Sequence, residues 1–283
     1  MQTIFQFKFP VQPVQSYSES KGMRRTYAAM ARGGDLNEGI FCDPANMVAE
    51  IDATLGLRAV AWGLAANQVG LPHGSACLAD DPGSGFDSKM TIRQAIDWNL
   101  PHLLEGKFGN WTDWILGMTI RLADGTVSKS GSRVVKNVAG YDAHKLLVGA
   151  RGTLGTILRV AVRIYPISSI QYYSTLALAG ADLRNLQSCW EKSDVHIFRV
   201  LPSDFESARE QYGDCILYAL ESSQTLWLSQ KPEAIPGSWV RTFSKGKEQL
   251  PELPELDRRL LQRMKSVFDP NGKLPSWEAT FVR

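Results

Sequence analysis

A short bend near the middle of the chain carries the residues best suited to chemistry. Residues 149–155 read GARGTLG, so glycines stand at Gly149, Gly152 and Gly155, with a hydroxyl at Thr153. Glycine has no side chain to hold the backbone away from a ligand, and backbone N–H groups bind phosphate oxygens. Thr153 can add a hydroxyl donor. The bend is therefore predicted to bind an anionic group such as a dinucleotide pyrophosphate. Taken singly, each glycine is equally typical of an ordinary turn.

Other side chains give weaker signals. The four histidines have no metal-ligand spacing and the four cysteines include no CxxC pair, so neither a metal site nor an iron–sulfur cluster is expected. Ser75 lacks the GxSxG context of a nucleophile elbow. His102 is a candidate site residue because histidine can move a proton, whereas His144 is expected at the surface or in packing.

Composition indicates an ordinary globular protein. The chain has 283 residues, of which 44% are hydrophobic and 21% charged, and its net charge is +2. So small a charge does not favour nucleic acid. No apolar run reaches the roughly 20 residues that span a bilayer, and the N-terminus does not read as a secretory signal. Reduced thiols and a cytoplasmic location are expected, with any membrane association made through partners.

The pattern of apolar residues and turn signals predicts an α+β fold. Two short strands are expected within 36–51, and a hairpin around the Asp124–Gly125 turn, with Trp111 and Trp114 in the core. Helices and strands alternate after residue 168, which predicts a first domain over 1–168 and a smaller α+β domain over 169–283. The expected helices or helical turns are 57–68 (ended by Gly70), 91–98, 142–148, 182–190 and 255–268. The further expected strands are 114–122, 126–130, 156–165, 171–178, 195–201, 214–220 and 225–228.

Three segments in this order carry a family resemblance. Residues 122–126 (LADGT), 135–142 (VKNVAGYD) and 149–155 resemble the FAD-binding (PCMH-type) domain of the FAD-linked oxidases of the vanillyl-alcohol oxidase type, and among them the flavin subunit of the bacterial glycolate oxidases. Residues 36–48 and the FDPNG run at 268–272 extend the resemblance over most of the chain after residue 36.

The resemblance implies a cofactor and its contacts. FAD would lie along the bend. Asp142 would cap the helical turn that follows Asp142 itself and leads into the bend. His102 would lie near the flavin ring. The cofactor-binding residues implied are Asn99, Leu116, Gly117, Gly140, Tyr141, Asp142, Gly152, Thr153, Gly155 and Ile157.

Three features depart from the family pattern. Residues 1–32 hold a single glycine where the family has a glycine-rich phosphate loop. Arg93 and Gln94 stand where the family has a glycine pair, and their side chains would crowd a flavin. Residues 273–277 read KLPSW instead of the family's Asn-Pro-Gly-Arg ending.

Two functions of different classes follow. In the first, the chain is an FAD-binding oxidoreductase subunit that oxidises a 2-hydroxy acid by hydride transfer to flavin, beside a second flavin subunit and an iron–sulfur subunit. In the second, it is a flavin-free, catalytically inactive scaffold subunit of an oxidase complex, as the departures favour. A start of the natural chain upstream of Met1 is a third explanation of the missing loop.

Overall fold

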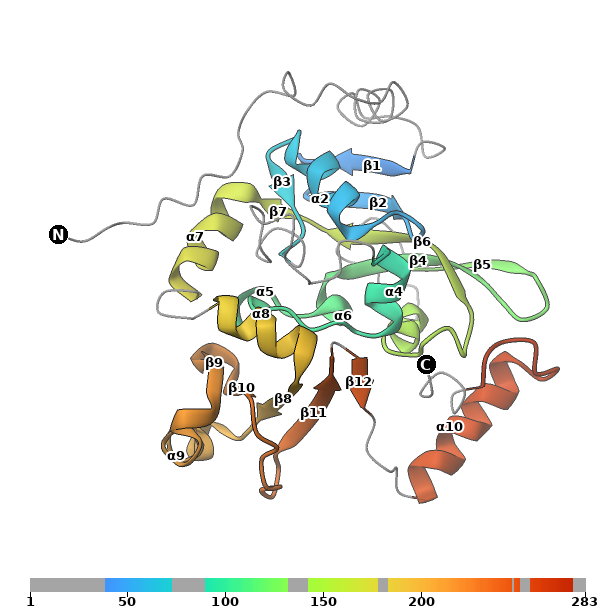
Figure 1. Cartoon of the computed structure of the whole chain (residues 1–283). Helices are drawn as coiled ribbons and strands as arrows, with labels where there is room; N and C mark the ends of the chain where they lie inside the picture. Colours follow the sequence, from blue (N-terminus) through green and yellow to red (C-terminus); the bar gives the residue numbers. More distant parts are fainter. Residues whose placement is uncertain are drawn as a thin grey trace.

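The chain folds around two antiparallel sheets of five strands each (Figure 1). The computed structural model describes residues 39–72, 90–131, 142–177, 183–245, 247–249 and 255–276. Helices and strands occur together in both halves, which confirms the predicted α+β class.

The first sheet has the order β1-β2-β6-β4-β5. Its two hairpins form where turn residues predict them: Asn46 bonds Asp43 between β1 and β2, and the Thr126 N–H donates to Asp124 between β4 and β5. β6 then inserts between β2 and β4, antiparallel to both. The strands are β1 (Ile40–Asp43), β2 (Val48–Asp52), β4 (Ile115–Arg121), β5 (Val127–Gly131) and β6 (Thr156–Arg163).

The second sheet has the order β12-β11-β8-β10-β9. Strand β8 lies at its centre, and short helical segments separate β8, β9 and β10 along the chain. Every pairing in this sheet is antiparallel. The strands are β8 (Asp194–Arg199), β9 (Ile216–Leu220), β10 (Thr225–Leu228), β11 (Trp239–Ser244) and β12 (Lys247–Gln249). A two-stranded sheet joins β3 (Val69–Gly70) to β7 (Tyr165–Pro166).

Helices and turns lie between the two large sheets and around them (Figure 1). They are α2 (Leu57–Ala65), α4 (Ile92–Asp97), α5 (Glu105–Phe108), α6 (Trp111–Trp114), α7 (Ile167–Ala177), α8 (Leu183–Lys192), α9 (Phe205–Gln211) and α10 (Glu255–Phe268). The 3-10 turns are η2 (Ala143–Leu147), η3 (Pro202–Asp204), η4 (Gly213–Cys215) and η5 (Glu221–Ser223). Among the described helices, none is both long and apolar enough to cross a bilayer.

One hydrophobic core runs through both sheets. Trp111 and Trp114 are fully buried, as predicted, and belong to the same cluster as Trp190 and Trp227 from the second half. The hydroxyl of Tyr218 on β9 donates to the carbonyl of Leu103 at 3.0 Å. The two halves are therefore held by shared apolar packing as well as by polar contacts.

Several predicted elements need correction. Residues 171–178 were expected as a strand, but 171–177 lie in helix α7, because burial of Ile170 and Ser174 one turn apart selects the helical period, and residue 178 lies outside the described residues. The 57–68 helix ends at Ala65, and Gln68 at φ +58° turns the chain instead of Gly70, which lies in β3. The sequence also missed α5, α6, α9, β3, β11 and β12.

Three of the four thiols lie in the part of the chain that the structure describes. Cys42, Cys189 and Cys215 are free, and Cys77 lies outside the described residues. Burial raises the pKa of the Cys42 thiol to about 11, so this group is an inert core residue.

Candidate functional site

The glycine bend leaves η2 and leads into β6. Gly149, Arg151 and Gly152 all have left-handed backbone, with φ values of +79°, +54° and +74°. This conformation is ordinary for glycine and strained for arginine, so the contacts of Arg151 must hold it in place. The bend therefore reverses direction within four residues and lies against the end of α4.

The outer amides of the bend bond α4. The Gly149 N–H donates to the Ile96 carbonyl, and the Arg151 N–H to the Asp97 carbonyl, each at 2.9 Å. The Gly152 N–H faces the Asp97 carboxyl group and lowers its pKa. Two backbone donors of the bend are thus bound to the last turn of one helix.

Two further amides of the bend donate to carbonyls within the bend or just before it. The Ala150 N–H donates to Leu147 at 3.1 Å, and the Thr153 N–H to Ala150 at 3.0 Å. The Thr153 hydroxyl also donates to the Ala150 carbonyl, at 2.7 Å. Four of the five N–H groups from 149 to 153, all except that of Gly152, therefore donate to protein carbonyls, as does the Thr153 hydroxyl.

Gly155 is required by packing. A Cβ atom there would lie 2.8 Å from Cγ2 of Ile120 and 3.3 Å from the Arg121 carbonyl on β4. Ile157 is fully buried in β6, and its carbonyl accepts from Nε of Arg93 at 2.7 Å. The Arg93 side chain, which takes the place of a family glycine, is thus fixed against the strand that follows the bend.

Asp97 is a buried acid at the centre of these contacts. Desolvation raises its pKa to about 7, although Arg93 and the Gly152 N–H oppose the rise. Among the described residues its Oδ1 has no hydrogen-bond partner. A carboxyl group with such a pKa changes charge near neutral pH, as general acids and bases do.

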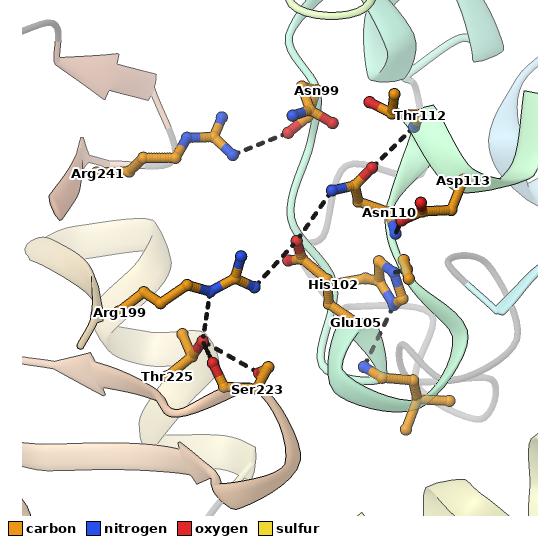
Figure 2. A network of polar contacts seen from close by, with 12 residues as sticks. Asn99, His102, Glu105, Asn110, Thr112, Asp113, Arg199, Ser223, Thr225 and Arg241 are labelled. Carbon is orange, nitrogen blue, oxygen red and sulfur yellow. Dashed lines mark hydrogen bonds and ion pairs between the residues drawn. The ribbon is translucent and has the colours of Figure 1, made fainter. Parts of the chain in front are cut away.

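Asn99 ends the α4 segment in a left-handed conformation, at φ +41°. Its side-chain Oδ1 is buried and finds no partner in the part of the chain that the structure describes. Its backbone carbonyl accepts from Nη1 of Arg241 at 2.9 Å, and the Trp98 carbonyl accepts from Nη2 at 3.0 Å (Figure 2). Arg241 of the second sheet thus binds the C-terminal carbonyls of a helix of the first half.

A carboxylate joins this arginine to the bend. Glu248 binds Arg241 at 2.6 Å and Arg151 at 2.8 Å. The exposed fractions of the three side chains are 9%, 12% and 6%, respectively. The Arg151 guanidinium also lies 4.5 Å from the centre of the Trp98 ring. We call Trp98, Arg151, Arg241 and Glu248 the arginine–glutamate seam. This seam covers the bend.

A second arginine makes a similar contact further along the same stretch. Arg199 on β8 lies 3.7 Å from Glu105, and its Nε donates to the Thr225 hydroxyl at 3.2 Å (Figure 2). Asn110 caps α6 with its side chain, and Asp113 completes the capping box. The 98–113 stretch is therefore held by Arg241 and Arg199 of the second sheet and by its own capping contacts.

The histidine candidates have structural contacts. His102 is fully buried; its Nε2 bonds the Gly109 carbonyl at 2.7 Å, and its Nδ1 accepts the Leu104 N–H at 3.2 Å. His144 is buried against Ser130, which agrees with the packing role, and burial lowers its pKa. Both imidazoles therefore hold turns of the chain.

The other predicted residues are dispersed around the bend. Leu116 and Gly117 lie in β4, where Gly117 pairs with Gly131. Asp142 precedes η2 but does not cap it, because its carboxylate binds Lys145 at 3.1 Å; this corrects the capping prediction. Gly140 and Tyr141 lie outside the described residues.

The residues that sequence reasoning missed are Asp97, Arg151, Arg241 and Glu248. Arg151 stands inside the recognised motif, but its partner Glu248 is 97 positions away and carries no local signal. In the part of the chain that the structure describes, no cluster of His, Cys, Asp or Glu could hold a metal ion.

Known proteins share parts of this sequence. The chain is 37% identical to glycolate oxidase subunit GlcD of Bacillus subtilis over 76 residues, 27% of this chain and 16% of that protein. It is 27% identical to D-lactate dehydrogenase of Archaeoglobus fulgidus over 156 residues, 54% of this chain and 34% of that protein. It is 38% identical to glycolate oxidase subunit GlcE of Escherichia coli over 58 residues, 20% of this chain and 17% of that protein. The matches span at most about a third of the length of these relatives.

Two further comparisons add less. No family model matches the chain. Among solved structures, BBE-like 1 of Physcomitrella patens matches with a TM-score of 0.37 and 14% identity, over 81% of this chain and 40% of that one; so low a score supports no argument about the fold. The sequence matches confirm the predicted recognition: the chain is related to glycolate oxidase subunits and D-lactate dehydrogenases, and so to the FAD-linked oxidases.

Proposed function

We propose that the chain is a subunit of an assembly that oxidises a 2-hydroxy acid, and that it contributes a folded scaffold instead of a bound FAD. Glycolate and D-lactate, named in its relatives, are both 2-hydroxy acids. The subunit names of two relatives favour an assembly of several chains. The observation that carries the proposal is the engagement of four of the five amides from 149 to 153, all except that of Gly152, by protein acceptors.

The physical argument concerns donors. A pyrophosphate needs backbone N–H groups that point to it and are not otherwise bonded. The bend donates instead to Ile96, Asp97 and its own carbonyls. Freeing these amides would cost about 1 kcal/mol for each bond and would disturb the buried arginine–glutamate seam. The described residues therefore do not fit the phosphate contact that the resemblance implies for Thr153, whose N–H and hydroxyl both donate to the Ala150 carbonyl.

A second candidate function is that the chain itself binds FAD, the group that supplies two-electron chemistry in such oxidases. The observation in its favour is a pair of buried acceptor atoms beside the bend, Oδ1 of Asp97 and Oδ1 of Asn99, for which the described residues offer no donor. A ligand with N–H or O–H groups would satisfy them. The proposed contacts would be Asn99, Leu116, Gly117, Gly140, Tyr141, Asp142, Gly152, Thr153, Gly155 and Ile157.

Absorption of the purified chain separates the two candidates. We expect no flavin bands at about 370 and 450 nm, and no quenching of FAD fluorescence when FAD is added. A double variant, Arg93→Gly with Gln94→Gly, restores the family's glycine pair and serves as the matched comparison. FAD that copurifies with the unchanged chain, or binds it saturably, would overturn the scaffold proposal and support the second candidate.

A further inference from the structure

Helix α10 is held to the body at its C-terminal end. The Lys265 ammonium donates to the Thr153 carbonyl at 2.9 Å, to Leu274 at 3.1 Å and to the Asp269 carboxylate at 2.6 Å. Asp269 also accepts the backbone N–H groups of Lys273 and Leu274, each at 2.8 Å. These contacts fix the helix beside the bend, while its N-terminal end lies apart from both large sheets (Figure 1).

The outer face of α10 carries an apolar stripe. Leu256, Leu260 and Val267 are 66%, 50% and 77% exposed, and Met264 completes the row. Their spacing of four, four and three residues places them on one side of the helix over about 17 Å. None of the helix residues with a described side chain is buried. Side chains of this size and spacing are normally covered by another surface.

One edge of the stripe is basic. Arg259 and Arg263 follow Leu256 and Leu260 by three positions each, so they stand one turn apart along the same side. With Gln262 and Ser266 they line a shallow hollow on the helix surface. The opposite edge begins with Asp257 and carries no arginine pair. The stripe thus presents leucines beside two aligned positive charges.

We infer that this face of α10 docks an apolar surface with a carboxylate edge on a different protein chain, the partner in the assembly on which this inference rests. Charge complementarity is the argument, because two arginines on one edge favour aspartate or glutamate opposite them. A second copy packed antiparallel about a two-fold axis would bring the Arg259 and Arg263 edge against itself. Residues 1–38 hold five Lys or Arg and three Asp or Glu, so their net charge has the same sign as this edge.

An anionic membrane surface fits the stripe less well. Its exposed members include no tryptophan, tyrosine or phenylalanine, which interfacial helices use as anchors, and Glu255 and Asp257 stand at its start. The observations therefore favour a protein surface.

The test uses two synthetic helical peptides that serve as stand-ins for the partner. Both peptides carry one identical leucine stripe. One has glutamates along the edge of the stripe and the other has lysines at the same positions. Fluorescence anisotropy at low salt should show the glutamate peptide binding the full chain about tenfold more tightly, the effect of two exposed ion pairs. The variant Arg259→Glu with Arg263→Glu should reverse the preference, and Leu260→Ser with Val267→Ser should abolish binding.

Controls separate this face from general stickiness. Leu146→Ser removes an apolar side chain that is 47% exposed and lies on η2, so it should leave peptide binding unchanged. Equal binding of both peptides, or no binding, overturns the inference. So does binding of the chain to phosphatidylcholine–phosphatidylserine vesicles that Leu260→Ser removes, or a dimer in sedimentation equilibrium that the same change dissociates. FAD uptake by a chain that still prefers the glutamate peptide would sink the scaffold proposal alone.

Discussion

The glycine bend and helix α10 use arginine in opposite ways. At the bend, Arg151 and Arg241 are almost wholly buried and share Glu248, so their charges hold the two halves of the molecule together. On α10, Arg259 and Arg263 line an open hollow beside exposed leucines. The segment with the strongest family resemblance is therefore closed by internal contacts, and the C-terminal helix presents the open surface.

The difference follows from burial. A buried guanidinium needs a hydrogen-bonded counter-charge, so Arg151 and Arg241 fix the position of Glu248 and are fixed by it. Exposed arginines need no such partner and remain able to meet another surface. Resemblance to a cofactor motif thus does not by itself make a segment available to a ligand.

Removal of the shared carboxylate should have the largest effect. Glu248→Gln leaves two buried guanidinium groups without a counter-charge, so we expect a loss of about 3–5 kcal/mol in the free energy of unfolding. Urea denaturation followed by tryptophan fluorescence measures it. The matched control is Glu221→Gln, which breaks an exposed pair with Arg209 and should cost under about 1 kcal/mol. Equal losses in the two variants would contradict the contrast between buried and exposed arginine contacts.

The buried acid should make stability depend on pH. Because the pKa of Asp97 is raised from 3.8 to about 7 by folding, its contribution is fully present below pH 3.8 and is lost as pH rises through 7. Above about pH 7, the loss in the free energy of unfolding approaches about 4 kcal/mol. Asp97→Asn can still accept the Gly152 N–H and should flatten this part of the pH profile. The surface change Asp214→Asn should leave the profile as it is, and a parallel profile for Asp97→Asn would refute the assignment.

Replacing glycines of the bend by alanine should lower the free energy of unfolding by different amounts, because each glycine is needed for a different reason. Gly155→Ala places a Cβ against Ile120 and should destabilise the chain by about 1–3 kcal/mol. Gly152→Ala meets only Asp97 at 4.0 Å but requires a left-handed alanine, at about 1–2 kcal/mol. Gly213→Ala has open space and should change the free energy of unfolding by less than about 0.5 kcal/mol. Thermal unfolding of the three variants gives the order, and a harmless Gly155→Ala would show that packing does not select this glycine.

The smallest effect is expected on the open face. Leu260→Ser removes a side chain that is half exposed, so the free energy of unfolding should change by less than about 0.5 kcal/mol. The same unfolding measurement checks it. A loss of several kcal/mol would mean that the stripe is covered by the chain itself.

Local patterns predicted much of the fold. The Asp124–Gly125 turn marked the β4–β5 hairpin, Thr91 marked the start of α4, and the spacing of leucines marked α10. The identity of α7 was missed because its helical burial depends on neighbours distant in sequence. The amphipathic pattern of α10 gave its period but not whether its apolar face would be covered.

The site was less predictable for the same reason. The bend was found from its glycines, but whether its amides were available depended on Ile96 and Asp97, which belong to another element. Glu248 could not be paired with Arg151 from sequence, since nothing local links positions so far apart. The FAD contacts predicted from the resemblance stay a prediction.

Hydrogen exchange at the bend tests the central claim most directly. The amides of Gly149, Ala150, Arg151 and Thr153 should exchange slowly in the chain without ligand, because each donates to a protein acceptor, and added FAD should leave their rates unchanged. Fast exchange at Arg151 and Thr153 that slows when FAD is added would contradict the account and show that the bend is open to the cofactor.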